Sequence, residues 1–180
     1  MLDSKQYSLR NYQKTVEDYA DYIELAEAAG VPDVMRQVIP EIYNQAMFAG
    51  TALLYDFPGY IYSLWQEYSI KELTEIAAFC REKNIQAATV YYKYWSEDVQ
   101  EIFDKKGIRL YIYTVNDLKE AQYYMQEGAA GVCSDYLQDT MFTDLSCRHY
   151  EMVVEDYYSC SCSGMNKGKD IRSKKNFNRI

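Results

Sequence analysis

Helical and strand-like patterns alternate along most of this chain. Apolar residues recur at helical spacing from Tyr12 to Ala26 and from Ile70 to Lys83, whereas short runs rich in β-branched and aromatic residues lie between the helical segments. These runs predict five strands, at residues 36–43, 60–65, 87–92, 109–115 and 131–134. A helix is predicted before the first strand and between each later pair, and the one at residues 44–55 is weakened by Gly50 and Thr51.

Several helix boundaries carry their own sequence signals. Gly30 followed by Pro32 ends the first helix. Ser69 with Glu72 has the form of a capping box, and Asp117 with Glu120 forms a second one. Strict alternation of strands and helices argues for parallel strands joined by right-handed crossovers, and therefore for an α/β fold.

The clearest such unit is the segment Gly107–Leu137, which reads as strand, helix and strand. A polar cluster follows each of its strands, Thr114 to Asp117 after the first and Ser134-Asp135 after the second. In barrels and open sheets built from such units, ligands sit at the carboxyl ends of the strands. This edge of the predicted sheet is therefore where chemistry is expected.

Length and charge narrow the possibilities. A chain of 180 residues suits one domain, but it is short for a closed eight-unit βα barrel, which takes about 250 residues. The net charge of -8 argues against nucleic acid as a partner. No signal peptide opens the chain and no apolar run is long enough to span a membrane, so we expect a cytoplasmic protein. Residues 1–138 form the predicted domain, and residues 139–180 an irregular extension with a basic, disordered tail.

No self-contained catalytic motif is visible, and no catalytic residue is predicted in this chain. A Gly-rich phosphate loop, a GxSxG motif and an HExxH motif are all absent. The single histidine, His149, follows the last strand and is expected at the surface. Cys80 and Cys133 suit reduced thiols within the fold, and the Cys160-Ser161-Cys162 spacing does not suit zinc.

A polar pair near the start of the chain and several strand ends are the candidate site residues. Asp3 and Lys5 share a face if the segment is extended, which suits a divalent cation beside a phosphate oxygen; a solvated N-terminus is the simpler alternative. Glu41, Asn116 and Asp135 lie at or near other strand ends. By spacing alone, each of these three could equally cap a helix or form a turn.

Two motifs resemble the closing strands of the glycerophosphodiester phosphodiesterase family. Residues 111–116 read YIYTVN and residues 131–135 read GVCSD, similar to the family's "WTVN" and "GVDGIxTD" segments, with Tyr113 in place of Trp. VIPEIYNQ at residues 38–45 and YIYSLWQ at residues 60–66 are similar to segments of a bacterial subgroup. Leu2 to Lys5 is similar to the family's E-x-K strand, with Asp3 in place of its metal-binding Glu and Lys5 in register with its Lys. The resemblance covers about residues 1–138.

The resemblance implies part of a TIM (β/α) barrel, its C-terminal strands and helices without the first ones. It implies metal-dependent hydrolysis of a small glycerophosphodiester to an alcohol and glycerol phosphate, a reaction of lipid metabolism. In that case Asp3 helps to hold Ca²⁺ or Mg²⁺, Lys5 and Glu41 contact the substrate, and Tyr113 stacks on its glycerol side. The family's two catalytic histidines and its ExD metal pair have no counterpart here, so we expect this chain to be incomplete and inactive by itself.

Three alternatives stay open. The chain is either a fragment of a longer hydrolase or a half-barrel that completes itself by self-association through its open edge. A second reading is a non-catalytic barrel remnant that binds a phosphoester or a protein partner. A more distant one is another α/β barrel, such as a sugar-phosphate isomerase, that shares only the βαβ pattern.

Overall fold

The computed structural model describes residues 12–142, and its strands and helices alternate as predicted. The strands are β1 (Glu41–Ile42), β2 (Ile61–Leu64), β3 (Ala87–Tyr91), β4 (Arg109–Tyr113) and β5 (Gly131–Cys133). The α-helices are α1 (Tyr12–Ala28), α2 (Gln45–Ala52), α3 (Ile70–Glu82), α4 (Glu97–Asp104) and α5 (Leu118–Gln126). Short 3₁₀ helices η1 (Pro32–Gln37), η2 (Tyr92–Tyr94) and η3 (Asp139–Phe142) lie between or after them.

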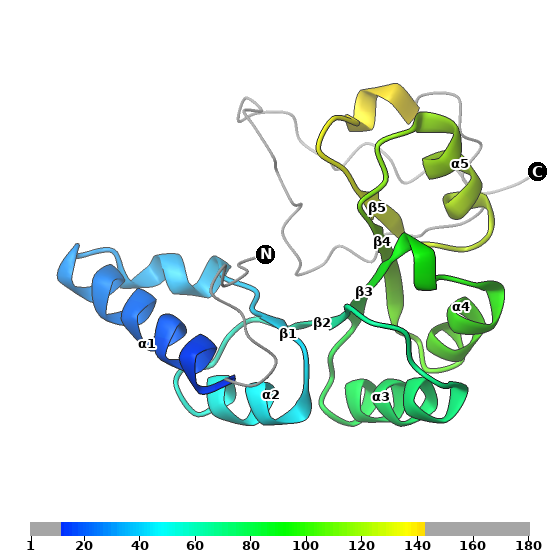
Figure 1. Cartoon of the computed structure of the whole chain (residues 1–180). Coiled ribbons are helices and arrows are strands. Elements are labelled where there is room, and N and C mark those ends of the chain that lie inside the picture. Colours follow the sequence, from blue (N-terminus) through cyan, green and yellow to red (C-terminus); the bar gives the residue numbers. More distant parts are fainter. Residues whose placement is uncertain (1–11, 143–180) are drawn as a thin grey trace, which may run out of the picture.

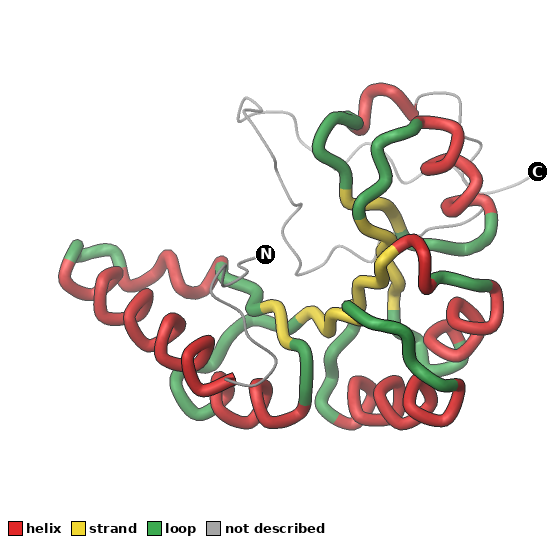
Figure 2. Tube along the Cα trace, viewed as in Figure 1, coloured by secondary structure: helices red, strands yellow, loops and turns green. Residues whose placement is uncertain are grey.

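The strands form one parallel sheet in the order β1-β2-β3-β4-β5, so each strand pairs with the next one along the chain. The sheet curves, and the helices follow one another around its outer side (Figures 1 and 2). Within the described residues the sheet does not close, and β1 and β5 are its edges. The predicted α/β class and parallel strands are confirmed, whereas self-association through the open edge stays a prediction.

The main core lies between the sheet and the helices. Strand register places Tyr62 beside Ala88 and Ala88 beside Leu110, so that every second residue of the strands points to the helices. This helix-facing set is apolar and buried: Ile42, Tyr62, Leu64, Ala88, Val90, Leu110 and Ile112. Each buried aliphatic side chain of this kind stabilises the fold by about 1.5–3 kcal/mol. The residues that alternate with this set face the concave side of the sheet.

Side-chain caps fix where four of the helices begin. Ser69 and Glu72 form the predicted capping box at α3, with the Ser69 backbone N–H donating to Glu72 Oε2 at 2.8 Å. Asp117 caps α5 by accepting from the backbone N–H groups of Lys119 and Glu120. Asn44 and Ser96 cap α2 and α4 in the same way. The boundaries read from the sequence therefore rest on local hydrogen bonds.

The glycine that weakened the prediction of α2 proves to be a packing requirement. Gly50 lies within α2, where a Cβ atom would stand 2.7 Å from Val16 Cγ2 of α1. Two helices can approach this closely only where a side chain is missing. The close contact between α1 and α2 therefore outweighs the low helix propensity of glycine.

The first strand is shorter than predicted. Arg36 and Gln37, predicted as strand, are the last two residues of η1, and β1 contains only Glu41 and Ile42. Pro32 begins η1, and Met35 within it is 3% exposed and packs in a second apolar cluster with Tyr19 and Phe57. Burial of Met35 in that cluster holds η1 against α1, which agrees with residues 36 and 37 continuing η1 instead of starting the strand.

A buried amide links α4 to the turn that precedes β5. Gln100 is 5% exposed, and its Nε2 donates to the backbone oxygen of Gly128 at 3.0 Å and to Asp104 Oδ1 at 2.9 Å. Its Oε1 accepts from the indole N–H of Trp95 at 3.3 Å. The amide therefore fixes the position of α4 relative to the α5–β5 turn and the loop before α4.

The described residues continue slightly past the predicted domain boundary at residue 138. Phe142, at the end of η3, packs partly buried against the main core. None of the helices between residues 12 and 142 has the length and apolar character that crossing a membrane needs. The division into residues 1–138 and 139–180 stays a prediction.

Candidate functional site

A group of polar side chains lies on the concave face of the sheet. Because Ile42, Leu64 and Val90 point to the helices, their strand neighbours point to the opposite side. We call four of these residues the concave-face cluster: Glu41 on β1, Ser63 on β2, Thr89 on β3 and Tyr113 on β4. They belong to the face that a complete barrel would enclose.

Three members of the cluster are buried and bonded to one another. Glu41 is 7% exposed, Ser63 1% and Thr89 3%. Thr89 Oγ1 lies 3.1 Å from Ser63 Oγ and 3.5 Å from Glu41 Oε1. A threonine hydroxyl carries one proton, so Thr89 donates to one of these two oxygens at a time. The arrangement joins three neighbouring strands through oxygen atoms alone.

Tyr113 brings an aromatic ring and a phenol to the same cluster. It is the last residue of β4, it is half-buried, and its hydroxyl donates to the backbone oxygen of Leu64 at 3.4 Å. Burial raises the pKa of the Tyr113 phenol, the nearby Glu41 carboxylate raises it further, and a hydrogen bond with Ser63 lowers it. The phenol is therefore neutral at neutral pH and can donate a hydrogen bond.

The structure thus brings together two of the predicted site residues, Glu41 and Tyr113, which are 72 positions apart in the sequence. Glu41 affects the titration of Tyr113, and both contact Ser63 or its bonded partner Thr89. The ring of Tyr113 also lies 5.8 Å from the ring of Tyr91, measured between centroids. A carboxylate, two hydroxyls and a phenol are groups that can bind the hydroxyls of a small polar molecule.

Asn116 and Asp135, the other strand-end residues, join the two loops that follow β4 and β5. Asn116 Nδ2 donates to Asp135 Oδ2 at 3.1 Å, and Asn116 Oδ1 accepts from Ser134 Oγ and from the Asp135 backbone N–H, each at 2.9 Å. Each of these two side chains is exposed. Their hydrogen bonds fix the loops, which is the turn-forming role that the sequence left open for them.

Asp3 and Lys5 lie outside the described residues, as does His149, so their roles stay predictions. Between residues 12 and 142, no three His, Cys, Asp or Glu side chains gather where a metal ion could bind. Calcium and magnesium take six or more oxygen ligands, usually including several carboxylates or waters, whereas the concave-face cluster supplies the single carboxylate of Glu41. The cluster by itself therefore does not fit a divalent cation.

The sequence does not predict Ser63 and Thr89 as site residues. The available signal is weak: each is a hydroxyl residue between apolar ones, in YIYSL and AATVY, at a position that period-2 alternation assigns to the face opposite the core. Strand register was needed to show that they lie side by side, because Ser63 pairs with Thr89 in the β2–β3 ladder.

Comparison with known proteins gives one kind of match. No family model matches the chain, and no curated protein matches it. Among solved structures, the chain is similar to a protein from Silicibacter pomeroyi DSS-3 that is provisionally named a glycerophosphoryl diester phosphodiesterase, with a TM-score of 0.52 and 10% sequence identity. The match covers 76% of this chain and 46% of that protein, so the chain spans less than half of its length. The likeness shows the fold alone, and it confirms a partial (β/α) barrel.

Proposed function

We propose that this chain is the C-terminal part of a phosphoric diester hydrolase of the glycerophosphodiester phosphodiesterase type. The observation that carries the proposal is the concave-face cluster, which gathers a carboxylate, two hydroxyls and a phenol on the inner face of a partial barrel. The similar fold of a protein provisionally named a phosphodiesterase adds support. Two motifs at residues 111–116 and 131–135 agree with the same family.

In this proposal the described residues bind the alcohol side of the substrate. The Glu41 carboxylate accepts a hydrogen bond from a glycerol hydroxyl, and the Tyr113 ring packs on the glycerol carbons. Lys5 would contact the phosphate, and Asp3 would be one ligand of Ca²⁺ or Mg²⁺ if the remaining ligands are supplied from elsewhere. The cation would stabilise negative charge on the phosphate oxygens.

The same observations limit what the chain can catalyse alone. The sequence contains one histidine, His149, and residues 12–142 contain no cluster of metal-binding side chains. A positioned general acid or base contributes about 10²- to 10⁴-fold to a rate. We therefore expect no detectable hydrolysis of glycerophosphocholine by the isolated chain with either metal.

A second candidate function is binding without hydrolysis. It is favoured by the position of Thr89 between Glu41 and Ser63, where its hydroxyl can donate to either oxygen and so occupies groups that a hydrolase would use on its substrate. Such a cluster can recognise the hydroxyls of a phosphoester as a receptor does. The alternative partner would be another protein that covers the concave face.

Calorimetric titration with glycerol 3-phosphate, together with a hydrolysis assay on glycerophosphocholine, separates these functions. Tyr113→Leu should weaken glycerol 3-phosphate binding at least about fivefold, because about 1 kcal/mol of ring contact is lost. Tyr136→Leu is the matched control, since Tyr136 is 73% exposed. Binding without turnover agrees with both candidates, because no turnover is expected of the isolated chain, and only a measurable rate separates them. A rate that Asp3→Ala abolishes supports the hydrolase, and binding that is absent or insensitive to Tyr113→Leu rejects both.

A further inference from the structure

A cavity of about 260 Å³ opens between the loops that precede α3 and α4. Its floor is apolar, formed by Leu64, Leu73 and Val90, each at most 4% exposed. Leu64 and Val90 belong to the helix-facing side of their strands, so this cavity lies on the opposite side of the sheet from the concave-face cluster. We call it the α3–α4 cavity. Its remaining lining residues are Gln66, Glu67, Tyr68, Ile70, Lys93, Tyr94, Trp95, Ser96 and Val99.

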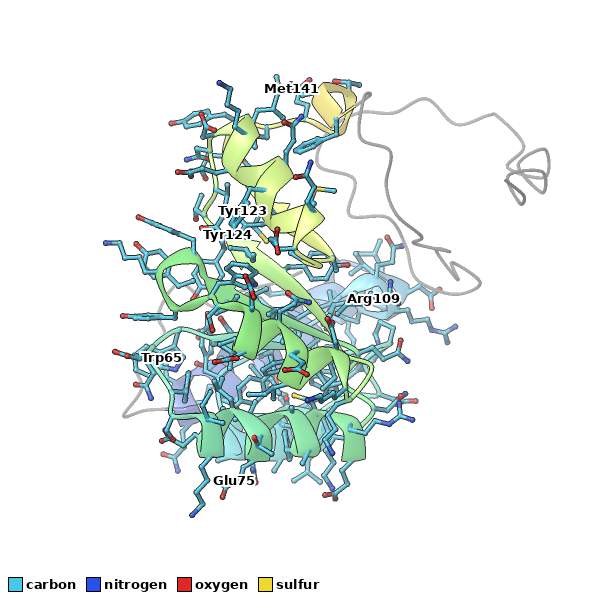
Figure 3. All side chains as sticks on the ribbon, turned by 90° about the vertical axis from the view of Figure 1, so that its right-hand side faces the viewer. Trp65, Glu75, Arg109, Tyr123, Tyr124 and Met141 are labelled. Atoms are coloured by element: carbon cyan, nitrogen blue, oxygen red, sulfur yellow. The ribbon has the colours of Figure 1, made fainter. Side chains whose placement is uncertain are left out.

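Three aromatic side chains, Tyr68, Tyr94 and Trp95, form much of the wall. Trp95 is held in place, because its ring lies 5.0 Å from that of Tyr124 between centroids and its indole N–H donates to Gln100. Tyr94 is 37% exposed and also contacts a neighbouring tyrosine ring. Tyr123 and Tyr124, labelled in Figure 3, both belong to α5. Aromatic faces attract organic cations, and rings around one cavity are the usual site for quaternary ammonium groups.

The charges near the cavity favour a cation over an anion. Glu67 is exposed and lines the cavity, and the first turn of α4 carries Glu97 and Asp98. At α3, the carboxylate of Glu72 already accepts hydrogen bonds from the backbone and the hydroxyl of Ser69. Each helix start beside the cavity therefore has its own acidic groups, which offset the positive end of the helix dipole.

Lys93 also lines the cavity, and its ammonium group lies over the rings of Tyr91 and Tyr92. Its ammonium group lies 5.8 Å from the centroid of Tyr91 and 5.8 Å from that of Tyr92. It is thus engaged in cation–π contacts of its own. Because the Lys93 ammonium lies over Tyr91 and Tyr92, the aromatic wall and the Glu67 carboxylate determine the charge of the ligand that the cavity favours.

We propose that the α3–α4 cavity binds a small organic ammonium ion, with the alkyl groups of the ion on the apolar floor and its charge beside the aromatic wall and Glu67. The volume is below that of sites for drug-sized ligands, which measure about 300–1,000 Å³, so one small cation is the appropriate occupant. The inference does not rest on the proposed function, because it is argued from other residues; the two sites are neighbours, since Tyr94 and Tyr113 both contact the ring of Tyr91.

Fluorescence of Trp95 provides a direct test. The chain has two tryptophans, and Trp65 does not line the cavity, so Trp65→Phe leaves Trp95 as the reporter. Titration of this protein with choline chloride should change Trp95 emission to saturation, whereas sodium chloride at equal ionic strength should not. The neutral isostere 3,3-dimethylbutan-1-ol should bind more weakly, because it fills the same space without a charge.

Variants locate the binding. Tyr94→Ala and Glu67→Gln should each weaken choline binding by about threefold to thirtyfold, the range expected for loss of a cation–π or charge contact, whereas Tyr94→Phe should retain it. Glu75→Gln is the matched control, because Glu75 lies on the outer face of α3, as Figure 3 shows, and its side chain is 64% exposed in an ion pair with Lys71. Circular dichroism checks that each variant is folded.

Two results would overturn the proposal. If 3,3-dimethylbutan-1-ol binds as tightly as choline, the cavity selects apolar shape and not charge. If choline gives neither saturable fluorescence change nor broadening of its methyl signal in ligand-observed NMR, no ammonium site exists here. The NMR measurement does not depend on the tryptophan reporter, and Glu67→Gln does not disturb the buried floor, so a variant that fails to fold leaves the test intact.

Discussion

Replacing Gln100 by leucine tests whether the amide that joins α4 to the α5–β5 turn stabilises the fold. Leucine keeps an apolar stem in the buried position but removes both the donor and the acceptor. Three hydrogen bonds are lost, to Gly128 at 3.0 Å, to Asp104 at 2.9 Å and from Trp95 at 3.3 Å. The substitution leaves the indole N–H of Trp95 without its acceptor, Gln100 Oε1.

The expected loss follows from these three bonds. A hydrogen bond contributes about 1 kcal/mol net, and a buried donor or acceptor without its partner costs about 1–3 kcal/mol. Burial of the leucine side chain offsets part of this, so Gln100→Leu should lower the free energy of unfolding by about 2–4 kcal/mol. That is a large share of the roughly 5–15 kcal/mol that stabilises a typical domain. The pKa of Asp104, raised by burial and lowered by its bond with Gln100, should rise further in the variant.

Urea unfolding followed by tryptophan fluorescence measures the change. Gln126→Leu is the matched control: Gln126 is the last residue of α5 and is exposed, so the same chemical change should alter stability by less than about 0.5 kcal/mol. If Gln100→Leu lowers the free energy of unfolding no more than the control does, the Gln100 amide does not stabilise the contact between α4 and the α5–β5 turn. Equal destabilisation by both variants would point instead to a general effect of added apolar surface.

Three further predictions concern local features. Ser69→Ala should lower the free energy of unfolding by about 1 kcal/mol, measured by urea denaturation, because the capping box at α3 loses its hydroxyl; an unchanged midpoint would contradict this. Hydrogen bonds from Ser69 lower the pKa of Glu72 below its usual 4.5, so this carboxylate should stabilise the fold above pH 4.5 and lose that contribution as pH falls through its folded pKa. Glu72→Gln should therefore be less stable at neutral pH. Its free energy of unfolding should also depend less steeply on pH below 4.5, as acid unfolding measures. Burial raises the pKa of the Cys80 thiol to about 12, so peptide mapping after iodoacetamide treatment at pH 8 should find Cys80 unmodified in the folded protein and modified in urea; rapid labelling of folded protein would show the thiol to be accessible.

Local chemistry explains the part of the fold that the sequence predicted. Ser69 and Asp117 cap helices through bonds that span two or three residues, and alternation of strand and helix needs no distant information. The helix at α2 was predicted correctly, but the role of Gly50 in it was not, because that role depends on Val16 of another helix. Helix propensity describes a glycine in an isolated helix, where it destabilises. In a close contact between two helices, the same glycine stabilises the fold because it leaves room for the neighbouring side chain.

The candidate site was predicted only in outline, for the same reason. Glu41 and Tyr113 were chosen from strand ends and family resemblance, but Ser63 and Thr89 became visible only through strand register. Thr89 meets Glu41 across 48 positions of sequence, a contact that no local pattern contains. The α3–α4 cavity likewise combines two loops that α3 and β3 separate in the sequence.

The sequential order of the strands bears on how the chain folds. Each strand from β2 to β5 pairs with the strand made directly before it, so each new βα unit finds its docking surface already built. Within residues 12–142, none of these strands has to wait for a partner from a distant part of the chain, which keeps loop-closure entropy small at each step. Synthesis delivers the units in this same order. The chain can therefore fold as it leaves the ribosome, with the growing edge of the sheet acting as the template for the next unit.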